Sequence, residues 1–167
     1  ILAEAKNGLK GAIIKFPRIS VGATENALLA AFKAKGRSIL KNCAIEPEIK
    51  DLILFLKKLG GQIKISGRTI TIERGKSKKL PIIHEVIFDR IEAGTYLIAS
   101  ALIGKKITID RINPKIIKYE ISTLKKMGVK IKVFKSSLKI QKNKVLKKTN
   151  ITTKPYPGFP TDLQAQL

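Results

Sequence analysis

A short run of residues occurs twice in this chain of 167 residues. The run Leu56–Gly60 (LKKLG) returns as Leu124–Gly128 (LKKMG), 68 residues further on. In both copies it ends an apolar pattern with helical spacing and precedes a polar–apolar alternation typical of a β-hairpin. An internal repeat of this period indicates a modular fold, in which one supersecondary unit is used more than once.

The first copy predicts the element order β-α-β-α-β-β. Residues 1–15 are expected to form two short strands around an Asn7-Gly8 turn. The elements predicted after them are a helix over 24–35 ended by Gly36, a strand over 38–40, a helix opened by Pro47 and ended by Gly60, and strands over 62–66 and 69–73.

After a polar connector at 74–79, the same order is predicted again. The elements are a helix over 91–103, a strand over 106–110, a helix opened by Asn113 and Pro114, and a hairpin over 129–134 and 138–141. A third copy is expected to begin at 159–164. The sequence therefore predicts a mixed α/β (α+β) fold of repeated units.

The composition bounds the class of protein. Hydrophobic residues make up 44% of the chain, enough for a real core, and no apolar run is long enough to span a bilayer. Cys43 is the single cysteine, so no internal disulfide is possible, and we interpret it as a core residue. His84 has no second ligand at metal spacing, so we interpret it as a surface or connector histidine.

The net charge of +22 leaves two interpretations open. Clustered basic residues bind nucleic acid through counterion release, so a basic repeat module that binds RNA is one alternative. However, only six of the 34 basic residues are arginines, and the lysines are scattered among isoleucines rather than aromatic residues. A generally solvated basic surface explains this pattern better.

A strand is predicted to pass into a helix within 16–26, where small and polar residues lie at the junction. Ser20, Gly22 and Thr24 precede the apolar helical run 27–32. A helix N-terminus offers free N–H groups and the positive end of the helix dipole, which suits a phosphate or diphosphate. The alternative, from the residues alone, is a plain helix cap.

Four motifs resemble the enolpyruvyl transferase family. They are Ser20–Asn26 (SVGATEN), Glu46–Ile49 (EPEI), Asp89–Thr95 (DRIEAGT) and Pro155–Gln166 (PYPGFPTDLQAQ). The resemblance covers essentially the whole chain, and the last motif is the most specific. It implies a fold of two globules, each built from three repeated units, with the active site in the cleft between them.

By this resemblance, residues 1–86 would be part of the first globule and residues 87–167 part of the second. The chain begins at Ile1 in what reads as the middle of a strand, so we expect an internal fragment. The family's reactive loop cysteine and the lysine that holds phosphoenolpyruvate would lie upstream. A segment without them is expected to be inactive alone.

The resemblance also implies an activity. The closest match within the family transfers the enolpyruvyl group of phosphoenolpyruvate to the 3′-hydroxyl of UDP-N-acetylglucosamine and releases phosphate, the first committed step of peptidoglycan synthesis. It implies a cytoplasmic enzyme, monomeric when full length, with small-molecule substrates, no cofactor or metal, and no nucleic-acid or membrane partner. The family's sibling branch, which acts on 3-phosphoshikimate, is the alternative enzyme.

Site residues follow from the same resemblance. Arg18, Ile19, Ser20, Val21 and Gly22 match the family's contact segment for the sugar nucleotide, and Arg18 stands where many members carry lysine. The family often has arginine at the position of Ile45, so this chain lacks any contact made by that side chain.

Asp162 matches the family's aspartate next to the acceptor hydroxyl, where a carboxylate can act as general base. From the residues alone, Asp162 would be the N-cap of a helix starting at Leu163, and the two roles are compatible. For Asp89, Arg90 and Glu92 two roles stay open, which are a structural ion-pair network and a part in domain closure.

Overall fold

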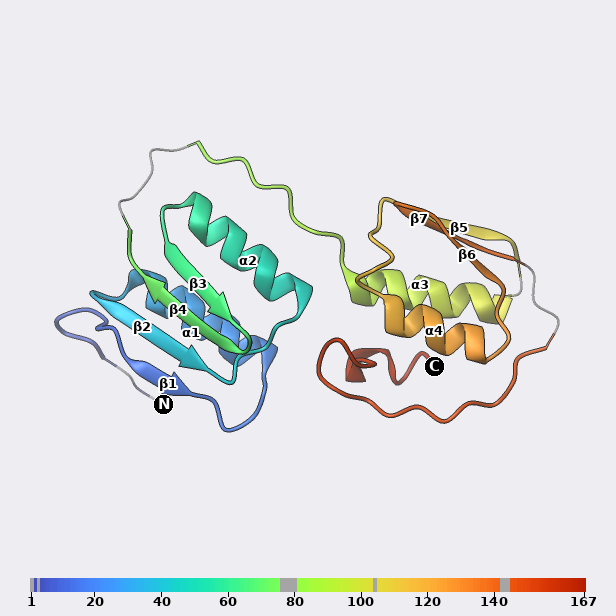
Figure 1. Cartoon of the computed structure of the whole chain (residues 1–167), viewed down its shortest axis with the longest axis horizontal. Helices are drawn as coiled ribbons and strands as arrows, with labels where there is room; N and C mark the ends of the chain where they lie inside the picture. The colour runs from blue at the N-terminus through green and yellow to red at the C-terminus, as the bar shows by residue number, and fades with distance from the viewer. Residues whose placement is uncertain (1, 3, 76–80, 104, 142–144) are drawn as a thin grey trace. The chain divides into compact units, whose positions relative to one another are not determined.

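Two separate hydrophobic cores organise the computed structural model, one in each of two units, Ile1–Ile87 and Phe88–Leu167 (Figure 1). The structure describes residues 2, 4–75, 81–103, 105–141 and 145–167. Both units combine helices with a β-sheet, so the predicted mixed α/β class is confirmed. Among the described residues, no helix is both long enough and apolar enough to cross a membrane.

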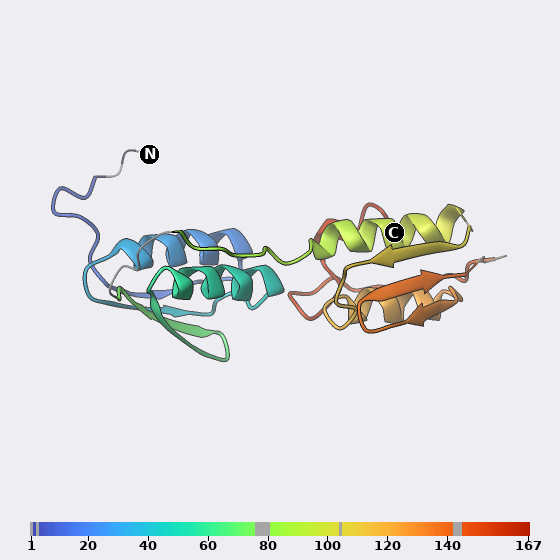
Figure 2. The same ribbon diagram turned by 90° about the horizontal axis from the view of Figure 1, so that it is seen from above.

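The first unit is a four-stranded sheet with two helices on one face (Figures 1 and 2). Its strand order is β1-β2-β4-β3, with β1 parallel to β2 and the other pairs antiparallel. Its elements are β1 (Ile13–Lys15), α1 (Val21–Lys33), β2 (Arg37–Lys41), α2 (Pro47–Lys58), β3 (Gln62–Ser66) and β4 (Thr69–Glu73).

The core of the first unit follows from the periodicity of the sequence. In α2, the apolar residues Ile49, Ile53 and Leu56 fall on one helix face and are buried. In β4, alternate residues Ile70 and Ile72 are buried beneath the helices, while Thr69 and Thr71, which alternate with them, face the other side of the sheet.

The second unit is a three-stranded antiparallel sheet of order β5-β7-β6 that shares one core with two helices. Its elements are α3 (Arg90–Ile103), β5 (Ile107–Asp110), α4 (Lys118–Lys126), β6 (Ile131–Val133), β7 (Ser137–Ile140) and the 3₁₀ helix η1 (Thr161–Leu163). From residue 145 on, the chain returns along the helices to η1 (Figure 1).

The repeated LKK-x-G run ends α2 and α4 in the same way. Gly60 (φ 103°) and Gly128 (φ 92°) both adopt the left-handed conformation that glycine tolerates. The amide after each glycine donates to the carbonyl of Leu56 or Leu124 at 2.9 Å, and the glycine amide donates to the residue after that leucine at 3.0 Å. This pair of bonds is the Schellman motif, so the repeat encodes a helix end followed by a hairpin.

The hairpin predicted at residues 1–15 is wrong for the described residues. The Asn7-Gly8 turn forms, with Gly8 at φ 73° and its amide 2.8 Å from the carbonyl of Ala5. However, the chain after the turn exchanges hydrogen bonds with Lys35 and then runs as β1 parallel to β2. The strand after the turn therefore pairs with β2, and none of the described residues before the turn belongs to a strand.

The predicted start of the fourth helix is also wrong. Asn113 accepts a hydrogen bond from the amide of Lys115 through its side chain (3.1 Å) and from the amide of Ile116 through its carbonyl (3.0 Å). These bonds form turns over residues 114–117, and α4 begins at Lys118. Most of the connector predicted at 74–79 lies outside the described residues.

Candidate functional site

The predicted anion site lies at the N-terminus of α1. Ser20 is the N-cap, with extended backbone (φ −144°, ψ 127°), and its Oγ accepts a hydrogen bond from the amide of Ala23 at 3.2 Å. None of the described residues accepts a hydrogen bond from the amides of Val21 or Gly22. The first turn of α1 contains no acidic residue, so the positive end of its dipole is not neutralised within the helix.

Thr24 fixes this helix start to the rest of the unit. Its side chain is fully buried, donates to the carbonyl of Ser20 at 2.7 Å and accepts from the amide of Ala44 at 3.0 Å. Asn42 adds a second link by donating to the carbonyl of Phe16 at 2.9 Å. The junction before α1 and the loop after β2 are therefore held together by buried or half-buried hydrogen bonds.

The contact segment alternates between anchored and solvent-facing residues. Ile19 and Val21 are half-buried against the core, whereas Arg18, Ser20 and Gly22 are exposed. A β-carbon added to Gly22 would meet no atom within 4 Å, so the space in front of the first turn is open. The segment thus presents a cationic side chain, a hydroxyl and free amides at one helix end, which suits an anionic ligand.

Asp162 lies in the second unit, whereas the site at the N-terminus of α1 belongs to the first unit. It is the middle residue of η1, whose N-cap is Pro160, and its side chain is exposed without a hydrogen-bond partner among the described residues. The N-cap prediction for Asp162 is therefore wrong. A single 3₁₀ turn forms where a longer helix was expected, because the amides of Leu163 and Gln164 bond to Pro160 and Thr161 three residues back.

The loop before Asp162 is held by its own hydrogen bonds and by a buried aromatic ring. The amide of Gly158 donates to the carbonyl of Pro155, and the amide of Lys154 donates to the carbonyl of Phe159, both at 2.9 Å. Phe159 is 1% exposed and its ring lies edge-on to Tyr119, with 6.3 Å between ring centroids. The carboxylate of Asp162 is thus presented from an anchored turn.

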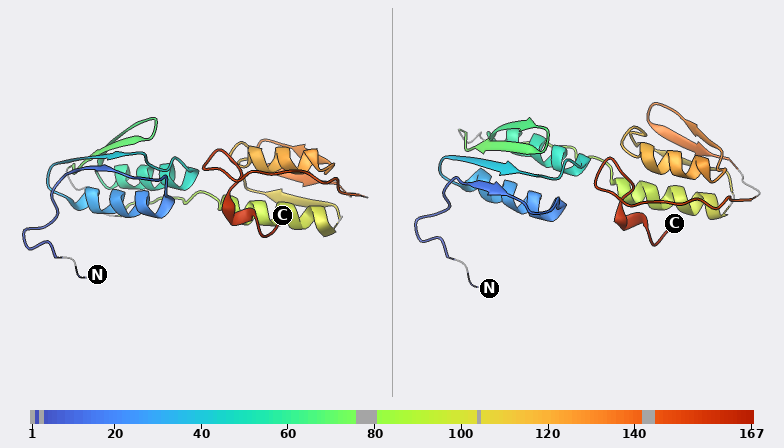
Figure 3. Two further views of the ribbon diagram at one scale, coloured as in Figure 1. Left: turned by 90° about the horizontal axis from the view of Figure 1, so that it is seen from below. Right: turned by 60° about the horizontal axis from the view of Figure 1, so that its bottom comes forward.

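The start of α3 lies beside η1 (Figure 3). Asp89 caps this helix, because its Oδ1 accepts from the amides of Ile91 (2.7 Å) and Glu92 (3.2 Å). Arg90 is buried, and its guanidinium carbon lies 5.9 Å from the centroid of the Tyr156 ring. The ion-pair network expected from Asp89, Arg90 and Glu92 is not formed among the described residues, since Asp89 serves as a cap.

Glu120 is a buried acid that the sequence did not single out. Burial raises the pKa of its carboxyl group, and this effect outweighs the opposing effects of a backbone hydrogen bond and of the positive charge of Arg90. Arg90 therefore faces an aromatic ring on the loop, and its charge acts on the carboxyl group of Glu120 on α4. Only the tertiary fold brings these side chains together.

Two further residues of the sequence analysis have definite places. Cys43 is fully buried, as predicted, and burial raises the pKa of its thiol. His84 lies in the connector between β4 and α3, one of its two predicted places, but its side chain is only 10% exposed and its Nε2 lies 3.1 Å from Oδ2 of Asp51. Its ring also lies 5.3 Å from that of Phe55. Asp51 is 33 residues away, so no sequence spacing indicated the pair.

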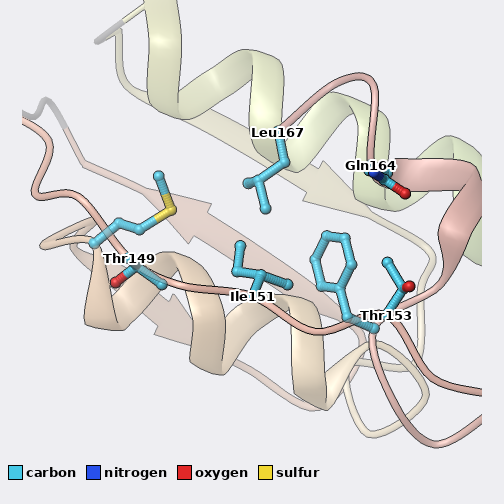
Figure 4. A pocket seen from close by; sticks show the side chains of 7 residues that line it. Thr149, Ile151, Thr153, Gln164 and Leu167 are labelled. Carbon is cyan, nitrogen blue, oxygen red and sulfur yellow. The ribbon is translucent and has the colours of Figure 1, made fainter.

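A cavity of about 320 Å³ lies in the second unit (Figure 4). Its lining combines apolar and polar residues without a charged side chain, and consists of Met127, Thr149, Ile151, Thr153, Phe159, Gln164 and Leu167. Within the described ranges there is no group of three or more His, Cys, Asp or Glu residues that could hold a metal ion.

Comparison with known proteins places this arrangement in context. Residues 2–167 match the family model described as EPSP synthase (3-phosphoshikimate 1-carboxyvinyltransferase). Over 99% of the chain, it is 55% identical to the UDP-N-acetylglucosamine 1-carboxyvinyltransferase of Pelagibacter ubique and 48% identical to that of Endomicrobium trichonymphae. It covers 40% of the length of each of these relatives.

The fold has a close counterpart among solved structures. The enolpyruvyl transferase NikO from Streptomyces tendae matches 96% of this chain with a TM-score of 0.81, at 22% sequence identity and over 41% of its own length. At that identity the likeness concerns the fold alone. The predicted likeness to enolpyruvyl transferases is confirmed by the family match and by this fold.

Proposed function

This chain belongs to the EPSP synthase family of enolpyruvyl transferases, and we propose that it forms part of an enzyme acting on UDP-N-acetylglucosamine. In the proposed reaction, the enolpyruvyl group of phosphoenolpyruvate is transferred to the 3′-hydroxyl of the sugar nucleotide and phosphate is released. The observation that carries the proposal is that relatives 40–55% identical over the whole chain are named for this activity. The chain spans about 40% of their length, so other parts of the active site would come from other residues.

Asp162 is proposed as the general base. The acceptor hydroxyl must lose its proton as its oxygen adds to phosphoenolpyruvate, and the resulting tetrahedral intermediate then loses phosphate. An exposed carboxylate on an anchored turn, without a competing hydrogen-bond partner among the described residues, is free to accept that proton. This geometry supports the role that the family resemblance implies.

The segment Arg18–Gly22 is proposed to bind the diphosphate of the sugar nucleotide. Arg18 supplies a full positive charge, while Ser20 and the free amides of Val21 and Gly22 supply hydrogen-bond donors at the positive end of α1. Residues 1–86 and 87–167 are proposed to belong to two different globules.

The remaining features of the proposal follow from the activity. An enzyme of peptidoglycan synthesis that uses a sugar nucleotide is expected in the cytoplasm, as a monomer, with roles in cell shape and cell division. The sibling activity on 3-phosphoshikimate shares the family description, but the relatives at 40–55% identity favour the sugar nucleotide. The basic charge is then a property of the surface, and binding of RNA is a weaker alternative that a steep salt dependence would reveal.

Replacement of Arg18 tests the diphosphate assignment. Arg18→Ala is expected to weaken binding of UDP-N-acetylglucosamine to the full-length protein by about 1.5–3 kcal/mol, the range for charge-assisted hydrogen bonds. Isothermal titration calorimetry measures this directly. The control is Arg37→Ala, another exposed arginine of the first unit that pairs with Glu73 at 3.4 Å. Unchanged affinity in Arg18→Ala, or an equal loss in both variants, would refute the assignment.

A further inference from the structure

We infer that the first half of α3 positions Asp162, with Gly94 and Arg90 as positioning residues. The inference rests on the proposed role of Asp162 as general base. Neither residue needs to touch a substrate for this role. Both act through the loop that carries the carboxylate, from a helix some 60 to 70 residues earlier in the sequence.

The closest contact is between Gly94 and Leu163, the residue next to Asp162. Leu163 is fully buried, and its side chain lies directly on the backbone of α3 at Gly94. A β-carbon added to Gly94 would overlap Cδ1 of Leu163 and would lie 3.3 Å from Cδ2 and 3.5 Å from Cγ. Glycine at position 94 therefore lets η1 seat against the helix.

Within the part of the chain that the structure describes, the packing of Leu163 accounts for a glycine at this position. Gly94 lies inside α3 with no positive φ, where alanine would favour the helix. The three described atoms nearest to an added β-carbon all belong to the side chain of Leu163. The sequence thus gives up helix stability at the point where η1 packs.

Two more contacts hold the same loop on the same stretch of helix. Arg90 is one helical turn before Gly94, and its guanidinium faces the ring of Tyr156 at 5.9 Å from the centroid. On the other side of Asp162, Nε2 of Gln166 donates to Oγ1 of Thr95 at 3.4 Å. The segment 156–166 is therefore fixed to α3 before, beside and after Asp162. A change in how this segment packs on α3 would move the carboxylate.

The test adds one methyl group at Gly94 in the full-length protein. Gly94→Ala is expected to lower kcat by about tenfold to a hundredfold, because a general base misplaced by about 1 Å loses that much rate. The affinity for UDP-N-acetylglucosamine, measured by calorimetry, is expected to stay within about twofold. Hydrogen–deuterium exchange of the peptide 155–167 is expected to rise, since the hydrogen bonds of η1 loosen when Leu163 is displaced.

Two comparisons separate positioning from general destabilisation. Gly61→Ala also adds a methyl group at a packed position, 3.0 Å from the carbonyl oxygen of Leu56 and 3.1 Å from the ring of Phe32, but it lies in the first unit. It should leave the exchange of peptide 155–167 and kcat unchanged. In a Leu163→Ala background the overlap is gone, so Gly94→Ala should change kcat by less than about twofold further, which is the non-additivity expected of contacting residues.

Unchanged exchange of peptide 155–167 in Gly94→Ala would overturn the inference whether or not the wild-type protein is active. Increased exchange with unchanged kcat in an active enzyme would overturn it too, since the packing of Leu163 on α3 would then have no effect on the function of Asp162. A tenfold loss that is equal in the wild-type and Leu163→Ala backgrounds would show that Gly94 acts by another route. A wild-type protein that releases no phosphate would refute the proposed function and, with it, the proposed catalytic role of the contact between Gly94 and Leu163. Hydrogen–deuterium exchange of peptide 155–167 would still test whether that contact holds the loop.

Discussion

Asp162→Asn is expected to lower turnover by at least about a hundredfold while the melting temperature stays nearly unchanged. A general base contributes roughly 10²–10⁴-fold to rate, and asparagine cannot accept the proton. Stability should not change because the Asp162 side chain is exposed and is not the cap of η1, whose N-cap is Pro160. Steady-state kinetics and thermal melting of the full-length protein measure the two effects.

The matched control for this variant is Asp110→Asn. Asp110 is an exposed aspartate of the same unit, at the end of β5, and should change neither turnover nor melting temperature. Calorimetry should also show that Asp162→Asn still binds the sugar nucleotide, since the proposed diphosphate contacts lie at α1. A small loss of turnover that merely follows a loss of stability would mean that the general base has to be sought at another residue.

Phe159→Ala is expected to destabilise the second unit by about 3–5 kcal/mol, the usual cost of removing a buried phenylalanine ring. Phe159 is 1% exposed, contacts Tyr119 edge-on and is one of the residues that line the cavity. Its removal would enlarge a cavity that already exists, so the surroundings have little means to refill the space. Chemical denaturation gives the free energy of unfolding.

Phe134→Ala is the control for this prediction. Phe134 is 47% exposed, and the centroid of its ring lies 5.3 Å from Nζ of Lys139. Removal of the ring should therefore lower the free energy of unfolding by less than about 1 kcal/mol. Equal effects of the two changes would show that the Pro155–Pro160 loop is not anchored in the core through Phe159. The support of the Asp162 turn would then need another explanation.

The elements with strong local signals could be predicted from the sequence. The glycine-ended helices are one example, because Gly60 and Gly128 each close a Schellman motif within six residues of chain. The β3–β4 hairpin is another, since alternation fixes which residues are buried and Gly67 supplies the positive φ of its turn. In both cases the determining contacts are local.

Errors arose where another hydrogen bond, distant or local, competed with the predicted one. The Asn7-Gly8 turn formed, but the choice of partner strand was decided by hydrogen bonds around Lys35, far along the chain. At Asn113, a side chain that can cap a helix bonded instead to the amide of Lys115 and made a turn. The signals at both sites are real, and each is compatible with two structures.

The candidate site divides in the same way. A cap among Ser20, Gly22 and Thr24 could be predicted from residue types; the structure gives this role to Ser20, with α1 beginning at Val21 and not at residue 24 as predicted. The supports of Asp162 could not, because Tyr156 reaches Arg90 and Leu163 reaches Gly94 only after the loop has folded onto α3. The pairing of His84 with Asp51 is hidden in the sequence for the same reason.

The central claim is that this chain contributes to transfer of an enolpyruvyl group to a sugar nucleotide. Phosphate release from phosphoenolpyruvate by the full-length protein tests it most directly, with UDP-N-acetylglucosamine and 3-phosphoshikimate supplied as acceptors in parallel. We expect phosphate release that depends on UDP-N-acetylglucosamine, is absent with 3-phosphoshikimate, and falls at least about a hundredfold in Asp162→Asn. Two results would contradict this expectation. One is release that requires 3-phosphoshikimate, and the other is no release with either acceptor.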